Sequence, residues 1–276
     1  MLIDISTILA SERKSNDSAV GYDSKSMAWV IDGYNGLYED PFDNWNNEGQ
    51  WYAKTLSKYL ENTDNKGKSL KEILKGASAH LESQYCGLKG IEKDSIGEKA
   101  GPFAGISLVR LLGHTAEYFQ LGYPEIIVDT NHSVQTFQDK RIYFIDTKMK
   151  EKQFNWENRP ALKKEKAIIN KYLNRQNGFW ELNFSDIPIE HGRTGKFPIC
   201  DGTQILLLSK GVLRTFQPFG IYSDPKYLMV DAGCHGLQRI WNMIRHYENS
   251  DPGCKKFQRI RTHENIAAAF LQIRAN

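Results

Sequence analysis

The chain of 276 residues carries 36 Lys and Arg against 33 Asp and Glu, with 40% hydrophobic and 12% aromatic residues. A chain of this length buries enough surface to fold without disulfides or a structural metal. The net charge of +3 is smaller than the strong basic excess typical of a dedicated nucleic-acid-binding protein. The aromatic content excludes global disorder.

The cysteines and the first residues indicate a cytoplasmic protein. No two cysteines stand at the C-x-x-C spacing of zinc and redox motifs, so we expect mostly buried free thiols. The first ten residues lack the basic and long apolar regions of a signal peptide. No uncharged apolar run approaches the ~20 residues of a membrane span. We therefore expect neither a membrane nor a nucleic-acid partner.

Strands and helices alternate in the first part of the chain. Residues 27–31 are apolar and predict a buried strand that stops at a turn formed by Asp32-Gly33. Apolar side chains at helical spacing predict a helix over residues 50–61. A second helix is expected to begin at Ser69, because Ser69 and Glu72 form a capping-box pattern.

Three consecutive strands are predicted over residues 106–112, 115–121 and 125–128, separated by glycine-containing turns. Residues 141–145 predict another strand. A polar excursion of helix and loop, rich in basic residues, follows around residues 148–177. We expect this excursion to be solvated, with at most a secondary role facing a substrate.

The last third of the chain returns to strands. Residues 203–209 predict an apolar strand, residues 237–244 a helix, and residues 266–273 a short closing strand. We find no repeat and no linker, which indicates a single domain over residues 1–276. The predicted fold is α+β: a β-sandwich of two antiparallel sheets flanked by helix pairs, in four layers.

Three predicted strand ends join an apolar run to a short polar turn, and a polar segment at residues 14–19 precedes the first. The three are Trp29-Val30-Ile31-Asp32-Gly33, Leu206-Leu207-Leu208-Ser209-Lys210-Gly211 and Thr262-His263-Glu264-Asn265-Ile266. Their order and spacing resemble the type-2C metal-dependent protein phosphatases (PPM class), over nearly the whole chain. The resemblance is greatest to a bacterial branch in which Asp-Gly is followed by a tryptophan-containing helix, here with Trp51.

The resemblance implies a site for two Mg²⁺ or Mn²⁺ ions at the ends of two central sheets. Hard cations of this kind take oxygen ligands, and clustered carboxylates offset their charge. In the family, water bound by both metals attacks a phosphomonoester. Asp32 matches the bridging aspartate, and Gly33 matches the residue whose carbonyl binds metal through water.

Other positions depart from the family pattern. Asp17 stands where the family usually has Glu, and Glu264 stands where it has a ligand Asp. Ser18, Tyr123 and Lys210 stand where it has Asp. The histidine that many members carry after the first strand has no clear counterpart, because Tyr34 follows Asp32-Gly33.

The lysine at position 210 has the largest consequence. A cation about 4 Å from a divalent metal would repel it by several kcal/mol at an effective dielectric constant near 20. A charged lysine donates three hydrogen bonds and has no lone pair for a metal. We therefore predict that Lys210 takes the place of a metal and pairs with Asp32 and Glu264.

These substitutions predict a catalytically impaired pseudophosphatase without a required cofactor. It would act as a regulatory module that binds another protein, such as a phosphoprotein or a kinase. Arg13 and Lys210 are the candidates for binding an anion such as phosphate. Two alternatives stay open: an active Mg- or Mn-dependent phosphatase in which Asp17, Asp32 and Glu264 keep one metal, and an α+β protein unrelated to phosphatases.

Overall fold

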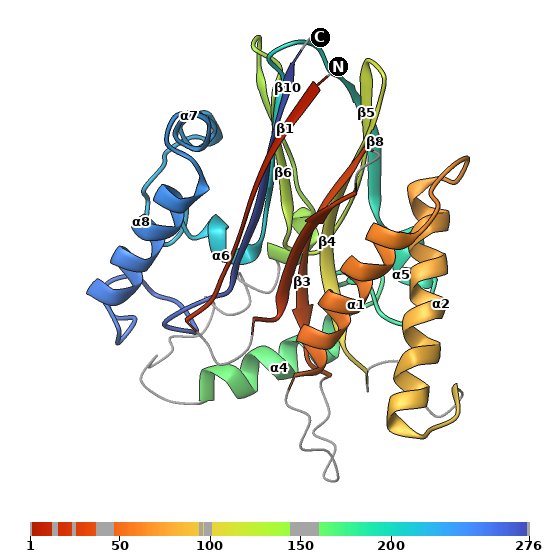
Figure 1. The fold of residues 1–276 in the computed structure, drawn as a ribbon. Helices are drawn as coiled ribbons and strands as arrows, with labels where there is room; N and C mark the ends of the chain where they lie inside the picture. The colour runs from red at the N-terminus through yellow and green to blue at the C-terminus, as the bar shows by residue number, and fades with distance from the viewer. Residues whose placement is uncertain are drawn as a thin grey trace.

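Two five-stranded antiparallel sheets form the centre of the protein (Figure 1). The computed structural model describes residues 2–12, 16–23, 26–36, 47–93, 96, 101–143 and 160–274. The first sheet has the order β1-β10-β9-β6-β7. Its strands are β1 Leu2–Ala10, β6 Glu125–Asp129, β7 Val134–Phe137, β9 Gln204–Leu208 and β10 Ile266–Arg274.

The second sheet has the order β2-β3-β4-β5-β8. Its strands are β2 Ser18–Tyr22, β3 Met27–Tyr34, β4 Phe103–Leu112, β5 Thr115–Leu121 and β8 Arg193–Pro198. Figure 1 shows the helices on the two outer sides of this sandwich, with α4 at the end opposite both termini. The helices are α1 Glu48–Asn62, α2 Leu70–Lys89, α4 Pro160–Tyr172, α5 Ile187–Glu190, α6 Lys210–Leu213, α7 Pro225–His235 and α8 Leu237–Ser250.

The alternation of side chains along β3 explains the layers. Met27, Trp29 and Ile31 pack with the apolar faces of α1 and α2, whereas Ala28 and Val30 pack against the other sheet. A third core fills the space between the first sheet and the α7–α8 pair. Because β3 is covered by helices on one face and by the other sheet on the other, its residues 27–31 are all apolar.

The predicted four-layer sandwich is confirmed, and so are most of its elements. The helices predicted at 50–61 and from Ser69 are α1 and α2, and the capping box joins Ser69 and Glu72. The closing strand is β10. Whether residues 1–276 form a single domain stays a prediction.

Three predictions about local structure are wrong. The strand at 27–31 does not stop at Asp32-Gly33 but continues to Tyr34. Residues 140–142 form a 3-10 turn capped by the Asp139 side chain, where we predicted a strand; residues 144 and 145 lie outside the described residues. The expectation of mostly buried thiols holds for Cys86 and Cys254 only, since Cys200 and Cys234 are exposed.

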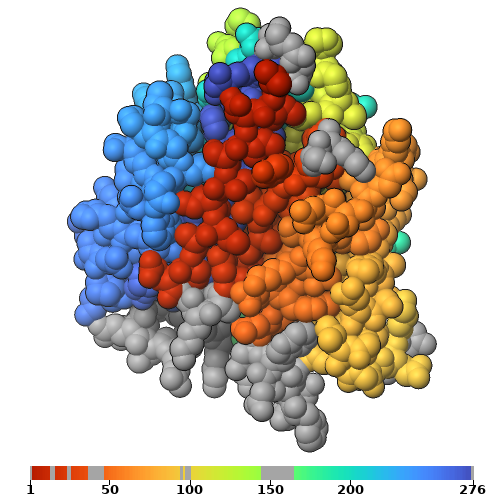
Figure 2. All heavy atoms as spheres, in the orientation of Figure 1, coloured from red at the N-terminus to blue at the C-terminus, as the bar shows by residue number. Residues whose placement is uncertain are grey.

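The N-terminal strand β1 was not predicted. It pairs with β10 along its whole length, from Leu2 opposite Arg274 to Ala10 opposite Ile266. Figure 2 shows the N-terminal residues (red) on the surface between the C-terminal helices (blue) and α1 (orange). β1 is an edge strand whose side chains are all exposed or half-buried, and Asp4, Ser6 and Thr7 interrupt its apolar residues. None of the described helices is long and apolar enough to cross a membrane.

Candidate functional site

The close approach of β3 and α1 places Asp32 at one end of the sandwich. The backbone N–H of Gly33 donates to the carbonyl of Asp17 at 2.9 Å. A Cβ at position 33 would lie 2.1 Å from the carbonyl oxygen of Gly49, at the start of α1. Glycine is therefore required at position 33 for strand and helix to pack this closely.

The Asp32 carboxylate joins the two sheets. One oxygen accepts a hydrogen bond from the Ser18 hydroxyl on β2, and the other accepts from the backbone N–H of Lys210 after β9, both at 2.7 Å. Asp32 is 5% exposed. Burial raises the pKa of Asp32 to about 6, although both hydrogen bonds and the Lys210 charge oppose this shift.

The turn after β9 fixes the position of Lys210. Ser209 bonds twice to Ala267 on β10: its N–H donates to the carbonyl, and its Oγ accepts from the amide, both at 2.9 Å. A Cβ at Gly211 would lie 2.0 Å from the Asn265 carbonyl oxygen. This turn therefore packs directly on the residues that lead into β10 and brings Lys210 near Glu264.

The ammonium of Lys210 does not pair as predicted. Its Nζ lies 3.9 Å above the centre of the Tyr123 ring and 3.8 Å from Oε1 of Glu165 on α4. Lys210 contacts Asp32 through its backbone amide instead. The prediction of direct ion pairs from Lys210 to Asp32 and Glu264 is therefore wrong, because the cation–π contact and Glu165 hold the side chain.

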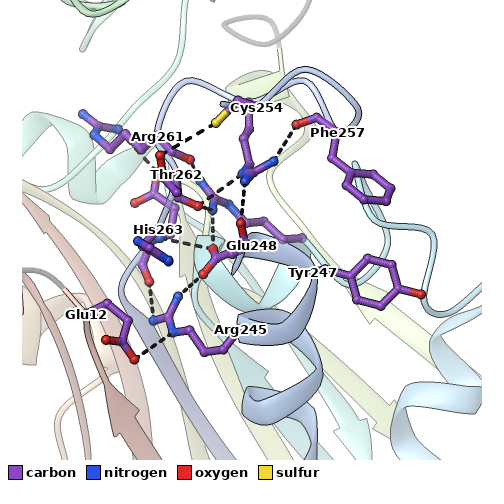
Figure 3. A network of polar contacts seen from close by, with 12 residues as sticks. Glu12, Arg245, Tyr247, Glu248, Cys254, Phe257, Arg261, Thr262 and His263 are labelled. Atoms are coloured by element: carbon purple, nitrogen blue, oxygen red, sulfur yellow. Dashed lines mark hydrogen bonds and ion pairs between the residues drawn. The ribbon is translucent and has the colours of Figure 1, made fainter. Parts of the chain in front are cut away.

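Glu264 is held by arginines. Its Oε1 lies 3.4 Å from Arg261 Nη1 and 3.5 Å from Arg214 Nη2. Arg214 also pairs with the fully buried Glu248 on α8. Figure 3 shows Glu248 facing Arg245, whose guanidinium also donates to the Glu264 carbonyl at 2.8 Å. This network fixes the segment that leads into β10.

These side chains surround one cavity of about 160 Å³. The predicted site residues that line it are Asp17, Asp32, Gly33, Lys210 and Glu264, together with Ser18 and Tyr123. Stretches of sequence far apart in the chain therefore converge as the resemblance implied. Arg13 lies outside the described residues.

Sequence reasoning missed Glu165, Glu181 and Arg261, which also line the cavity. Glu165 belongs to the polar excursion, which we predicted to be solvated; instead Glu165 is buried and pairs with Arg261 at 3.3 Å. No local signal distinguishes Glu165 from its charged neighbours. Glu181 stands alone among the apolar residues Phe179, Trp180 and Leu182, a pattern that indicates a buried acid.

The cavity is more acidic than basic. Acidic side chains in its lining are Asp17, Asp32, Glu165, Glu181 and Glu264, and basic ones are Lys166, Lys210 and Arg261. Burial raises the pKa of Glu181 well above its usual range, and the Lys210 charge opposes this. Among the described residues, no group of three or more His, Cys, Asp or Glu side chains is placed to hold a metal ion.

The chain is similar in structure to bacterial serine/threonine phosphatases. The Mycobacterium tuberculosis phosphatase PstP/Ppp aligns with a TM-score of 0.61 and 10% identity over 100% of both chains. The PstP catalytic domain in complex with two manganese ions aligns with a TM-score of 0.58 and 11% sequence identity, over 99% of both chains. PppA, a key regulatory component of T6SS in Pseudomonas aeruginosa, aligns with a TM-score of 0.57 and 14% sequence identity. The alignment covers 99% of this chain and 98% of PppA.

At these identities the similarity establishes the fold, as the resemblance to type-2C phosphatases predicted. No protein-family model matches the sequence, and no curated protein does. The fold is thus shared with bacterial serine/threonine phosphatases, one of them in complex with two manganese ions.

The buried Asp32 predicts a pH dependence of stability. Its pKa rises from 3.8 to about 6 on folding. A raised pKa contributes stability that is present below the unfolded-state value and is lost as the pH rises through the folded-state value. We expect wild type to lose about 3 kcal/mol of unfolding free energy relative to Asp32→Asn between about pH 3 and pH 7. Urea denaturation of both proteins across this range measures the difference; a constant difference would contradict the prediction.

The contact at Gly33 predicts a strong effect of one methyl group. Gly33→Ala is expected to lower the unfolding free energy by about 1–3 kcal/mol, because the Gly49 carbonyl must move. Gly87→Ala on α2 is the matched control, since a Cβ at position 87 would meet nothing within 4 Å. Gly87→Ala should leave the unfolding free energy equal to that of wild type or raise it, because alanine is more stable than glycine within a helix. Equal denaturation midpoints for the two variants would refute the proposed close packing.

Proposed function

We propose that this protein is a pseudophosphatase: a phosphatase-fold protein that does not catalyse metal-dependent hydrolysis and acts as a regulatory module for a protein partner. A phosphoprotein or a kinase is the class of partner we propose. One structural neighbour, PppA, is itself a regulatory component, which supports a regulatory role for the fold.

The carrying observation is the position of the Lys210 ammonium. The ammonium lies in the cavity, 3.9 Å from the centre of the Tyr123 ring. By the sequence resemblance, Lys210 and Tyr123 both occupy positions where the family has an aspartate. A divalent ion beside this ammonium would be repelled by several kcal/mol at about 4 Å. Lys210 therefore supplies positive charge to the carboxylates that a metal would otherwise neutralise.

The remaining oxygen donors are also engaged. Both Asp32 oxygens accept hydrogen bonds, from Ser18 and from Lys210 N–H. Glu264 faces the guanidinium groups of Arg261 and Arg214. Each Asp32 oxygen keeps a second lone pair, but a metal bound to Glu264 would lie close to two guanidinium groups, and their charge disfavours the two-metal centre of the family.

An anion would also meet competition in this cavity. The candidate Lys210 already faces Glu165, and the acidic lining disfavours a phosphate dianion near it. Binding of a phosphoprotein at Lys210 would therefore require Glu165 to be displaced. The role proposed for Arg13 rests on the sequence alone.

The alternative function is an active Mg- or Mn-dependent phosphatase with an atypical site. Its support is the structural neighbour that contains two manganese ions. Asp17, Asp32 and Glu264 line the same cavity and are the residues that would hold one metal in this case, with Lys210 binding phosphate.

Hydrolysis of para-nitrophenyl phosphate with millimolar manganese separates the two functions. We expect no manganese-dependent turnover above the rate without enzyme. Turnover that is lost in Asp32→Ala, with that variant still folded by circular dichroism, would establish the active phosphatase instead.

Substitution of Lys210 tests the charge argument. Lys210→Asp should bind manganese more tightly than wild type in calorimetric titration, because it removes a repelling cation and adds an oxygen donor. Lys166→Asp is the matched control, since Lys166 also lines the cavity but is exposed on α4. If both variants gain the same affinity, general charge rather than the position of Lys210 decides metal binding.

A further inference from the structure

A second and larger cavity adjoins the one described above. Its volume is about 590 Å³, within the range of small-molecule pockets, about 300–1,000 Å³. The two cavities share four lining residues: Tyr123, Glu165, Lys210 and Glu264. The larger cavity extends from these residues over β6 and β7 and along α6, toward the start of α7.

Its walls combine apolar and flat surfaces with a polar rim. Ile127, Leu213 and Phe216 contribute apolar surface, and the rings of Tyr123 and Tyr143 add planar surface. The exposed amides of Gln217 and Gln258 lie among the lining residues as well. Sites for small organic ligands combine apolar walls of this kind with polar or charged groups that fix the orientation of the ligand.

The cations of this cavity are already paired. Lys210 faces Glu165, Arg214 pairs with Glu248, and Arg259 lies 2.8 Å from Asp251 Oδ2. An anionic ligand would have to compete with these internal carboxylates.

Glu125, at the start of β6, is different. It is 5% exposed, and among the described residues its carboxylate has one side-chain partner, the neutral hydroxyl of Tyr143, which donates to it. Burial raises the pKa of Glu125 to about 7, and the hydrogen bond from Tyr143 opposes this shift. Glu125 is thus a buried acid in the lining, and no cationic partner faces it within the described part of the chain, a costly arrangement.

We propose that this cavity binds a small organic cation with a planar apolar body, such as an aromatic amidine or amine, whose charged group pairs with Glu125. The cation would give Glu125 a charge-assisted hydrogen bond in a site of low dielectric constant. The planar body would cover the apolar wall and stack near the tyrosine rings. This site requires neither metal nor phosphate, so it is independent of the function proposed above.

Three probes of similar shape and different charge test the site: benzamidine, benzamide and benzoate, titrated at pH 7.5 and followed by protein-observed NMR. We expect saturable binding of benzamidine, weaker binding of benzamide and the weakest for benzoate. In Glu125→Gln, benzamidine should bind about tenfold more weakly or worse, while benzamide changes little. The amide introduced by Glu125→Gln still offers an oxygen to Tyr143, so this variant is expected to fold.

Two further variants keep the test decisive. Leu213→Phe narrows the cavity and leaves Glu125 in place, and it should also weaken benzamidine binding. Glu61→Gln makes the same charge change on the exposed surface of α1, away from the cavity lining, and should have no effect. The proposal is overturned if benzamidine fails to bind at millimolar concentration, binds Glu125→Gln as well as wild type, or binds more weakly than benzoate.

Discussion

The buried carboxylate of Asp32 is the constraint on which the described site depends. It belongs to one sheet, and it accepts a hydrogen bond from the backbone amide of Lys210, which follows a strand of the other sheet. A buried charge that loses a partner costs several times the net worth of an ordinary hydrogen bond. The contact therefore joins β3 of one sheet to the turn after β9 of the other at the lining of the cavity.

The same requirement, that buried charge be paired, organises the far side of the cavity. Glu248 on α8 is fully buried between Arg214 and Arg245, and Arg214 reaches Glu264 in turn. Arg259 donates to the backbone carbonyl of Glu248 at 3.1 Å and so attaches the segment after α8 to the same network. Glu165, Glu248 and Glu264 thus each face a cationic side chain of the chain itself, which supports the proposed function. Glu125, in the adjoining cavity, has a neutral tyrosine hydroxyl as its side-chain partner among the described residues instead, and this led to the proposed cation site.

The sequence predicted which segments meet but not how their side chains pair. Asp32, Lys210 and Glu264 stand beside three apolar runs of the sequence, and the fold brings them to the lining of one cavity. The strand β1 was not predicted, because the polar residues Asp4, Ser6 and Thr7 break its apolar residues into short pieces.

The partner of Lys210 was beyond reach from the sequence for a different reason. Its ammonium could turn to any carboxylate within the length of its side chain, and the choice of Glu165 depends on where α4 packs. Glu165 is 45 positions earlier, in a segment whose many charges hide the one that becomes buried. Pairings of this kind are decided by tertiary packing, which local patterns do not encode.

A crystal structure grown in millimolar manganese, with anomalous diffraction recorded at the manganese edge, tests the central claim most directly. The account predicts no anomalous peak in the cavity lined by Asp32 and Glu264, with the Lys210 ammonium still over the Tyr123 ring. Manganese peaks coordinated by Asp32, with the Lys210 side chain displaced from the cavity, would contradict it.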